Sequence, residues 1–192
     1  IRDLAAIYRA YLQATIAIQL QYRVAMAIWL IGLVLQPIVY LVVWRTVAGA
    51  GAVGGYDASG FAAYYIVLMI VNHVTFAWVM HEYDYEVRQG LLSAKLLKPT
   101  HPIHIHLADN VSYKAIALVV VLPAAGLLAL YFQPRLSATP TQIAAFGLSL
   151  LLAFVLRWLV EYTLALAAFW TTRVSAVNNL YFAAFWFLAG MV

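Results

Sequence analysis

Four histidines that lie close together in the sequence are the first residues whose type could support chemistry: His81, His101, His104 and His106. Imidazole is a ligand that zinc prefers. We expect Pro102 to break the helix that would align these rings, because proline removes a helix hydrogen bond. The chain also has no cysteine to complete such a site. The sequence therefore predicts no metal ligands.

Arg157 and Glu161 form a second group, because their i,i+4 spacing places both side chains on one face of an apolar helical run. An ion pair in lipid is costly unless it faces a protein partner or an aqueous cavity. Two interpretations stay open: a contact that locks helices together, or a lining of a transport route. The same two interpretations apply to Asn72 and Thr75, which share a face in the middle of another apolar run.

Enzyme signatures are missing from the sequence. There is no GxxxxGK[ST] loop to hold a nucleotide and no GxSxG turn to present a serine nucleophile. No pair of carboxylates occurs in a setting that general acid and base catalysis would need. We expect no catalytic residues, no enzyme activity and no cofactor bound by this chain.

The composition indicates what kind of structure must position these side chains. Of 192 residues, 66% are hydrophobic and 9% are charged, whereas soluble domains are about 45–50% apolar and about 25% charged. So few charges cannot cover a soluble surface, which predicts an all-α polytopic membrane protein in contact with lipid. The net charge of +4 comes from basic residues between apolar runs, where they set topology, so we predict no nucleic-acid partner.

The apolar runs predict one transmembrane domain over residues 1–192, with an amphipathic helix followed by at least five membrane segments. Residues 1–23 are expected to lie in the membrane interface; the alternative is the polar start of the first span. The predicted segments are 24–47, 61–80, 107–132, 141–170 and 174–192. Because the chain opens on Ile1 and stops inside an apolar run, we expect a fragment truncated at its C-terminus.

The distribution of basic residues predicts the orientation in the membrane. The inner side of this topology contains eight of them, against two on the outer side: Arg2, Arg9, Arg23, Arg88, Lys95, Lys98, Lys114 and Arg173 inside, Arg45 and Arg135 outside. Cytoplasmic loops carry such an excess of lysine and arginine. We therefore expect a multi-pass protein of the cell (inner) membrane with a cytoplasmic N-terminus.

Residues 81–102, the polar segment, concentrate charge between two membrane segments. They contain three of the seven carboxylates and three of the eleven basic side chains: Glu82, Asp84, Glu86, Arg88, Lys95 and Lys98. The spacing predicts a short helix with an Asp84–Arg88 pair, then a turn at Gly90 and a leucine patch. These are the features of a docking element at the cytoplasmic surface; an ordinary interfacial loop helix is the alternative.

The sequence of residues 86–99, EVRQGLLSAKLLKP, resembles the E-[IV]-R-x-G-x-L-S-x-x-L-L-[KR]-P signature of permease subunits in the ABC-type-two exporter superfamily. It is most similar to the multidrug or antibiotic export branch. The order of an amphipathic connecting helix, two spans, a cytoplasmic coupling helix and further spans also resembles that family. The resemblance implies a type V ABC exporter fold with six membrane segments, and residues 185–192, FWFLAGMV, resemble the start of its re-entrant hairpin.

The resemblance also implies the partners. Two permease subunits, identical or homologous, pair with each other, and each docks its coupling helix into a groove of an ATP-hydrolysing subunit dimer that binds the ATP. The residues that carry over to the docking contact are Glu82, Glu86, Arg88, Gly90, Leu92, Lys98 and Pro99. ATP binding would move these segments and open a route between the permeases.

We therefore expect export of a hydrophobic or amphipathic small molecule, driven by a separate ATPase through the polar segment. A secondary transporter is one alternative, but it needs coupling-ion carboxylates deep in its spans, where only Glu161 qualifies and has Arg157 beside it. A membrane sensor or structural subunit that does not transport is the other alternative. Co-purification with an ATPase would separate the first interpretation from these.

Overall fold

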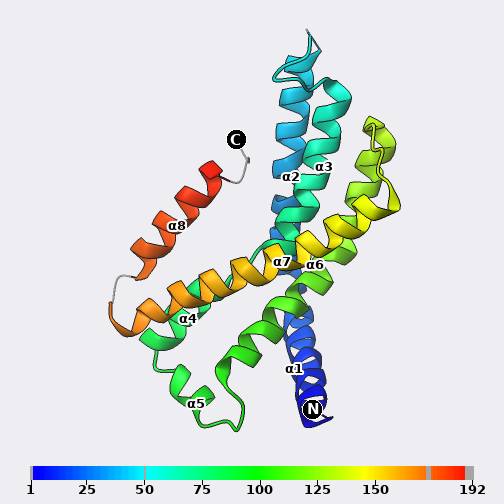
Figure 1. Cartoon of the computed structure of the whole chain (residues 1–192). Helices are drawn as coiled ribbons and strands as arrows, with labels where there is room; N and C mark the ends of the chain where they lie inside the picture. Colours follow the sequence, from blue (N-terminus) through cyan, green and yellow to red (C-terminus); the bar gives the residue numbers. More distant parts are fainter. Residues whose placement is uncertain (1, 50, 172–173, 189–192) are drawn as a thin grey trace.

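A computed structural model describes residues 2–49, 51–171 and 174–188, and it is helical almost throughout (Figure 1). These residues contain no strand, only an isolated bridge between Val53 and Tyr56 in the loop after the first span. The predicted all-α polytopic class is therefore confirmed. Arg173 and residues 189–192, which include the end of the predicted hairpin start, lie outside the described residues.

The described helices follow one another with short connections. They are α1 (Arg2–Gln21), α2 (Arg23–Ala48), α3 (Ala58–Thr75), α4 (Val79–Arg88), α5 (Leu92–Leu96), α6 (Pro102–Phe132), α7 (Pro140–Ala165), the 3-10 helix η1 (Leu166–Phe169) and α8 (Val174–Leu188). Four stretches are long and apolar enough to cross a membrane: Arg23–Ala48, Ala58–Arg88, Pro102–Phe132 and Pro140–Phe169. Helix α8 is apolar but shorter.

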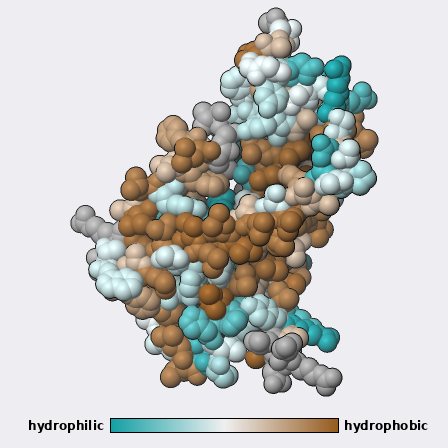
Figure 2. All heavy atoms as spheres, in the orientation of Figure 1, coloured by the Kyte–Doolittle hydropathy of each residue, from teal (hydrophilic) through white to brown (hydrophobic). Residues whose placement is uncertain are grey.

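The outer faces of the long helices are apolar and exposed. Large side chains such as Val39, Val119, Leu130 and Leu156 point away from the rest of the chain. Figure 2 shows the resulting brown band across the middle of the molecule, with hydrophilic residues concentrated toward the two ends. In a membrane protein, lipid covers apolar surfaces of this kind, because their exposure to water would be unfavourable.

Two of the helices begin at prolines. Thr139 and Gln142 form a capping box at the start of α7, with Pro140 in the first turn. At the start of α6 the His101 ring accepts a hydrogen bond from the Ile103 amide, and Pro102 follows in the first turn. The prediction that Pro102 breaks a helix is wrong. A backbone N–H in the first turn has no partner within the helix, so a proline there removes no helix hydrogen bond.

The second predicted span is interrupted. Helix α3 ends at Thr75, the backbone leaves the helix at Phe76 with φ −56 and ψ 136, and α4 begins only at Val79. The ammonium of Lys114 donates to the carbonyl of Phe76 and, at 2.7 Å, to Oδ1 of Asn110. A carbonyl freed by a break inside an apolar region needs such a donor, so α6 stabilises the joint between α3 and α4.

The largest buried cluster joins the polar segment to helix α7. Met80 and Tyr83 of α4 pack there with Leu92, Trp158 and Tyr162. Helix α7 crosses α3 and α4 (Figure 1) and also packs against them. The polar segment is therefore held against a membrane helix by an apolar core, rather than attached only through its two ends.

Gly90 gives the first testable prediction, because its φ of +72 lies in the left-handed region. A Cβ at this position would meet no atom within 4 Å, so only the backbone conformation opposes a side chain. We expect Gly90→Ala to lower stability by about 1–2 kcal/mol, the cost of a left-handed conformation for an L-residue. Thermal unfolding of the detergent-solubilised protein measures this.

Gly126 of α6 is the matched control, since a Cβ there also meets nothing within 4 Å but the backbone is helical. Gly126→Ala should leave stability unchanged or raise it, because alanine favours a helix interior over glycine by about 0.5–1 kcal/mol. Equal stability of the two variants would show that the protein does not require the left-handed backbone conformation at Gly90.

Candidate functional site

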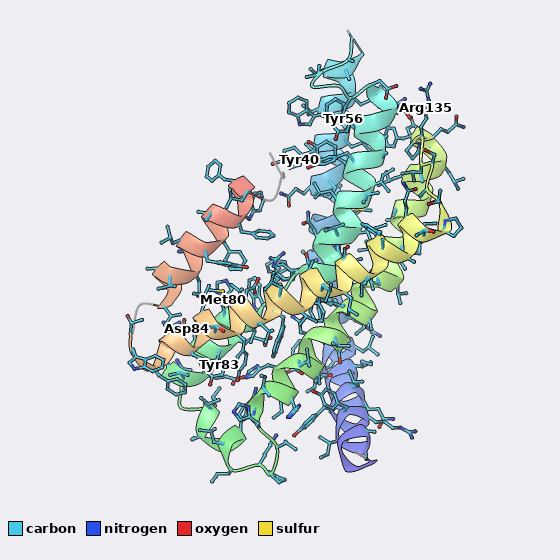
Figure 3. The ribbon with its side chains drawn as sticks, in the orientation of Figure 1. Tyr40, Tyr56, Met80, Tyr83, Asp84 and Arg135 are labelled. Atoms are coloured by element: carbon cyan, nitrogen blue, oxygen red, sulfur yellow. The ribbon has the colours of Figure 1, made fainter. Side chains whose placement is uncertain are left out.

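The polar segment folds as α4, a turn at Gly90, the short helix α5 and a loop that leads into α6. Asp84 is buried and pairs with Arg88 one turn later, which confirms the predicted i,i+4 pair. Figure 3 labels Met80, Tyr83 and Asp84 on α4, near the end of α7. One face of α4 is thus buried against the membrane helices, and the loop with α5 projects beyond it.

Glu86 is directed inward and connects three elements. Its Oε1 lies 2.5 Å from Nζ of Lys95 on α5, and its Oε2 lies 3.4 Å from Nε2 of His106 on α6. Only 12% of the Glu86 side chain is exposed. The repulsion expected between Glu82 and Glu86 is therefore relieved by basic groups of the same chain. Glu86 holds α4, α5 and α6 in one arrangement.

The residues proposed for docking divide by exposure. Arg88, Gly90, Lys98 and Pro99 are exposed, Glu82 and Glu86 are half-buried, and Leu92 is buried in the α4–α7 core. No contact with a partner is described, so the docking role of all these residues stays a prediction. The burial of Leu92 favours a supporting role for its side chain.

Three other leucines supply the exposed apolar surface of the polar segment. Leu91, Leu96 and Leu97 are all exposed, and Leu97 is the most open of them, at 88%. The basic side chains of Arg88 and Lys98 border them in the sequence. We call Leu91, Leu96 and Leu97 the leucine patch. An exposed apolar patch with a charged border is typical of a protein contact surface.

Helix α1 is joined to the beginning of α6 by polar contacts. The hydroxyl of Tyr8 lies 2.8 Å from Nδ1 of His104, and the hydroxyls of Thr15 and Ser112 are 2.6 Å apart. Tyr11 also contacts Thr100, at 2.5 Å. A displacement of the polar segment would therefore be transmitted to both α1 and α6.

Within the membrane region, two of the predicted residues, Glu161 and Thr75, both contact Arg157. Nε of Arg157 donates to Oε1 of Glu161 at 2.8 Å, and Nη1 donates to Oγ1 of Thr75 on α3 at 3.4 Å. The hydroxyl of Tyr181 on α8 donates to Oε1 of Glu161, also at 3.4 Å. These contacts connect α3, α7 and α8, which supports the interpretation as a contact that locks helices together.

A cavity of about 140 Å³ lies beside this ion pair. It supports the other interpretation, in which these residues line a transport route. Its lining includes Asn72, His73, Arg157, Phe76 and Phe185. The guanidinium of Arg157 lies 4.0 Å from the centroid of the Phe185 ring, within the range of a cation–π contact. The cavity offers aromatic surface and two or three polar groups, so Arg157 lines a space as well as contacting Glu161.

The sequence did not predict the one group of described residues that could hold a metal ion. Ligand atoms of Glu82, His106 and Asp109 all lie within 4.8 Å of one another. Two of these residues are on α6 and one is on α4, so their proximity depends on how the two helices pack. Helix α6 is continuous through both residues, so their i,i+3 spacing places His106 and Asp109 on one helix face.

Comparison with protein families gives one match, which covers most of the chain. The family model described as ABC-2 family transporter protein matches residues 30–191. No curated protein and no solved structure matches the chain.

Proposed function

Since the chain belongs to the ABC-2 family of transporter proteins, we propose that it is the permease subunit of an exporter driven by a separate ATPase. Members of this family are membrane subunits that work with an ABC ATPase. The observation that carries the proposal is the leucine patch on a segment that is fixed to α6 and α7 through Glu86 and the α4–α7 core.

The leucine patch is the proposed ATPase-docking surface. Leu91, Leu96 and Leu97 would enter an apolar groove of the ATPase, and Arg88 and Lys98 would contact its acidic rim. ATP would be bound by a dimer of the partner, and a second permease, identical or homologous, would complete the transporter. We infer that this chain itself binds no nucleotide.

Coupling follows from the contacts within the chain. A docked polar segment that moves as a rigid unit would displace α4, and the Lys95–Glu86–His106 contacts would displace α6 with it. ATP and the exported molecule must each favour a different one of two arrangements for hydrolysis to drive transport. The tight packing between α4 and α7 provides the stiffness that this mechanism needs.

The cavity beside Arg157 supports a hydrophobic or amphipathic small molecule as the exported substrate. Aromatic rings such as Phe76 and Phe185 would bind its apolar part, and Asn72 and Arg157 would bind a polar part. Secondary transport and a sensor role remain the competing proposals. A secondary transporter has no use for the leucine patch, whereas a sensor derived from such a permease could keep it, so measured export separates the sensor role from the proposed function.

The proposed orientation places the N-terminus in the cytoplasm and the protein in the cell (inner) membrane. Helix α1 and the polar segment lie toward the same end of the molecule (Figure 1). Tyr56 and Arg135, from two loops of the proposed outer side, lie together at the opposite end (Figure 3). Arg135 pairs there with Asp57 at 3.7 Å, which links those two loops.

Leu97→Glu tests the proposed docking surface. A carboxylate in the most exposed leucine of the patch would have to be desolvated in the groove, so we expect at least about tenfold less ATPase to co-purify with the chain. The measurement is affinity purification from solubilised membranes in which both subunits are produced.

Leu136→Glu is the matched control, because Leu136 is also exposed but lies in the loop between α6 and α7. This variant should retain the ATPase as the unchanged chain does. Full retention by Leu97→Glu, or equal loss in both variants, would contradict the proposed docking surface.

A further inference from the structure

We propose that Glu82, His106 and Asp109 form a binding site for one divalent transition-metal ion of the zinc type between α4 and α6. Their ligand atoms all lie within 4.8 Å of one another. One imidazole nitrogen and two carboxylate oxygens are ligands that zinc accepts, whereas magnesium and calcium prefer oxygen alone. This site goes beyond the transport proposal.

The environment of His106 is the second, independent observation. Its side chain is 0% exposed, yet neither ring nitrogen has a hydrogen-bond partner among the described residues. Nδ1 lies 3.8 Å from Oε2 of Glu82, and Nε2 lies 3.4 Å from Oε2 of Glu86, but neither contact has hydrogen-bond geometry. A buried imidazole that makes no hydrogen bond is costly even beside two carboxylates, and a metal ion would use the free electron pair of its neutral form.

The three residues line a cavity with room for an ion and water. This cavity of about 520 Å³ lies between α1, α2, α4 and α6, and Glu82, His106 and Asp109 belong to its lining. Oε1 of Gln19, another lining residue, is buried and also lacks a hydrogen-bond partner in the part of the chain that the structure describes. The unpaired atoms around the cavity thus include the acceptor Oε1 of Gln19 and the acceptor nitrogen of a neutral His106 ring, both of which could interact with a positively charged occupant.

Local charge points to a divalent ion. Three carboxylates, those of Glu82, Glu86 and Asp109, lie around His106, and Lys95 is the basic side chain that pairs with Glu86. An imidazole that binds a metal ion is neutral, so in the metal-bound state three negative charges and the positive charge of Lys95 leave two negative charges for the ion to balance. Oxygen and nitrogen ligands of one tetrahedral zinc ion are about 3.3 Å apart, since each bond is about 2.0–2.2 Å long. Small side-chain rotations would bring the present atoms to that separation, and the ion would then join α4 to α6.

Zinc binding to the metal-stripped, detergent-solubilised protein tests this site. We expect about one zinc ion per chain to remain after size-exclusion chromatography, as measured by elemental analysis. His106→Asn and Asp109→Asn should each weaken zinc binding by at least about 100-fold, because each removes a direct ligand. Zinc should raise the unfolding temperature of the unchanged protein and not of these variants.

His101→Asn is the matched control, because His101 is exposed and asparagine also caps a helix N-terminus well. It should bind zinc as the unchanged protein does. Should His106→Asn fail to fold, Glu82→Gln gives the same comparison with a side chain of equal size. The proposal is overturned if the unchanged protein retains no zinc, or if the ligand variants retain as much as His101→Asn does. No ATPase takes part in the measurement, so failure of the metal site would leave the transport proposal untouched.

Discussion

Glu86→Lys is expected to reduce ATP hydrolysis by the complex of this permease with its ATPase by about tenfold or more, while membrane insertion is retained. The substitution replaces the 2.5 Å contact between Glu86 and Lys95 with two like charges beside His106. The connection from α5 through α4 to α6 would then be lost. Measurement of ATPase activity in reconstituted complexes, with the amount of inserted permease determined in parallel, tests this expectation.

The exchange variant Glu86→Lys with Lys95→Glu separates two explanations for that loss. If Glu86 acts inside the chain mainly through Lys95, as its low exposure favours, the exchanged pair restores the ion pair between α4 and α5 and much of the ATPase activity, although the contact with His106 is not restored. If Glu86 instead contacts the ATPase directly, the exchange leaves the complex inactive. We expect restoration. If the exchanged chain stays inactive, co-purification of the ATPase decides the reason: a complex that still forms points to the lost contact with His106, and a complex that no longer forms points to a direct contact between Glu86 and the ATPase.

Helix class and local pairs were predictable from the sequence because both depend on spacing along a single helix. The pairs Asp84–Arg88 and Arg157–Glu161 have i,i+4 spacing and are formed. The apolar composition likewise predicted the membrane helices, because lipid requires helices with paired backbone groups. Their exact ends were less predictable.

The break after Thr75 had no local signal. Residues 76–78 are Phe, Ala and Trp, none of which interrupts a helix by itself. The break depends on Lys114, which lies far along the chain and donates to the carbonyl of Phe76. A tertiary contact of this kind cannot be found from periodicity, so the sequence predicted one continuous span there.

The contacts between α4 and α6 were hidden for the same reason. Glu82 and Glu86 were predicted as docking contacts from the family resemblance, and nothing in the sequence indicated that both also face His106. Leu92 is buried while its neighbour Leu91 is exposed, and a short leucine run has no periodicity that would distinguish them. The metal interpretation was set aside because Pro102 was expected to break the helix carrying His101, His104 and His106. The predicted third span also began at residue 107, between His106 and Asp109.

Arg157→Met is expected to lower stability by about 3–5 kcal/mol, the usual cost of leaving one member of a buried ion pair without its partner. The Glu161 side chain is 0% exposed and that of Arg157 is 8% exposed, so the Glu161 carboxylate would stay buried without its guanidinium partner. For a protein of this size the unfolding temperature should fall by about 10 °C. Thermal unfolding in detergent measures the change.

The double variant Arg157→Met with Glu161→Met gives the sharper comparison. It removes both charges together, and two apolar side chains can fill the site between α3, α7 and α8, so we expect stability close to that of the unchanged protein. A double variant as unstable as Arg157→Met would mean that the two side chains contribute more to stability than the neutralisation of each other's charge. Its hydrogen bonds to Thr75 and Tyr181 would then be what holds the three helices together, because those bonds are lost in both variants.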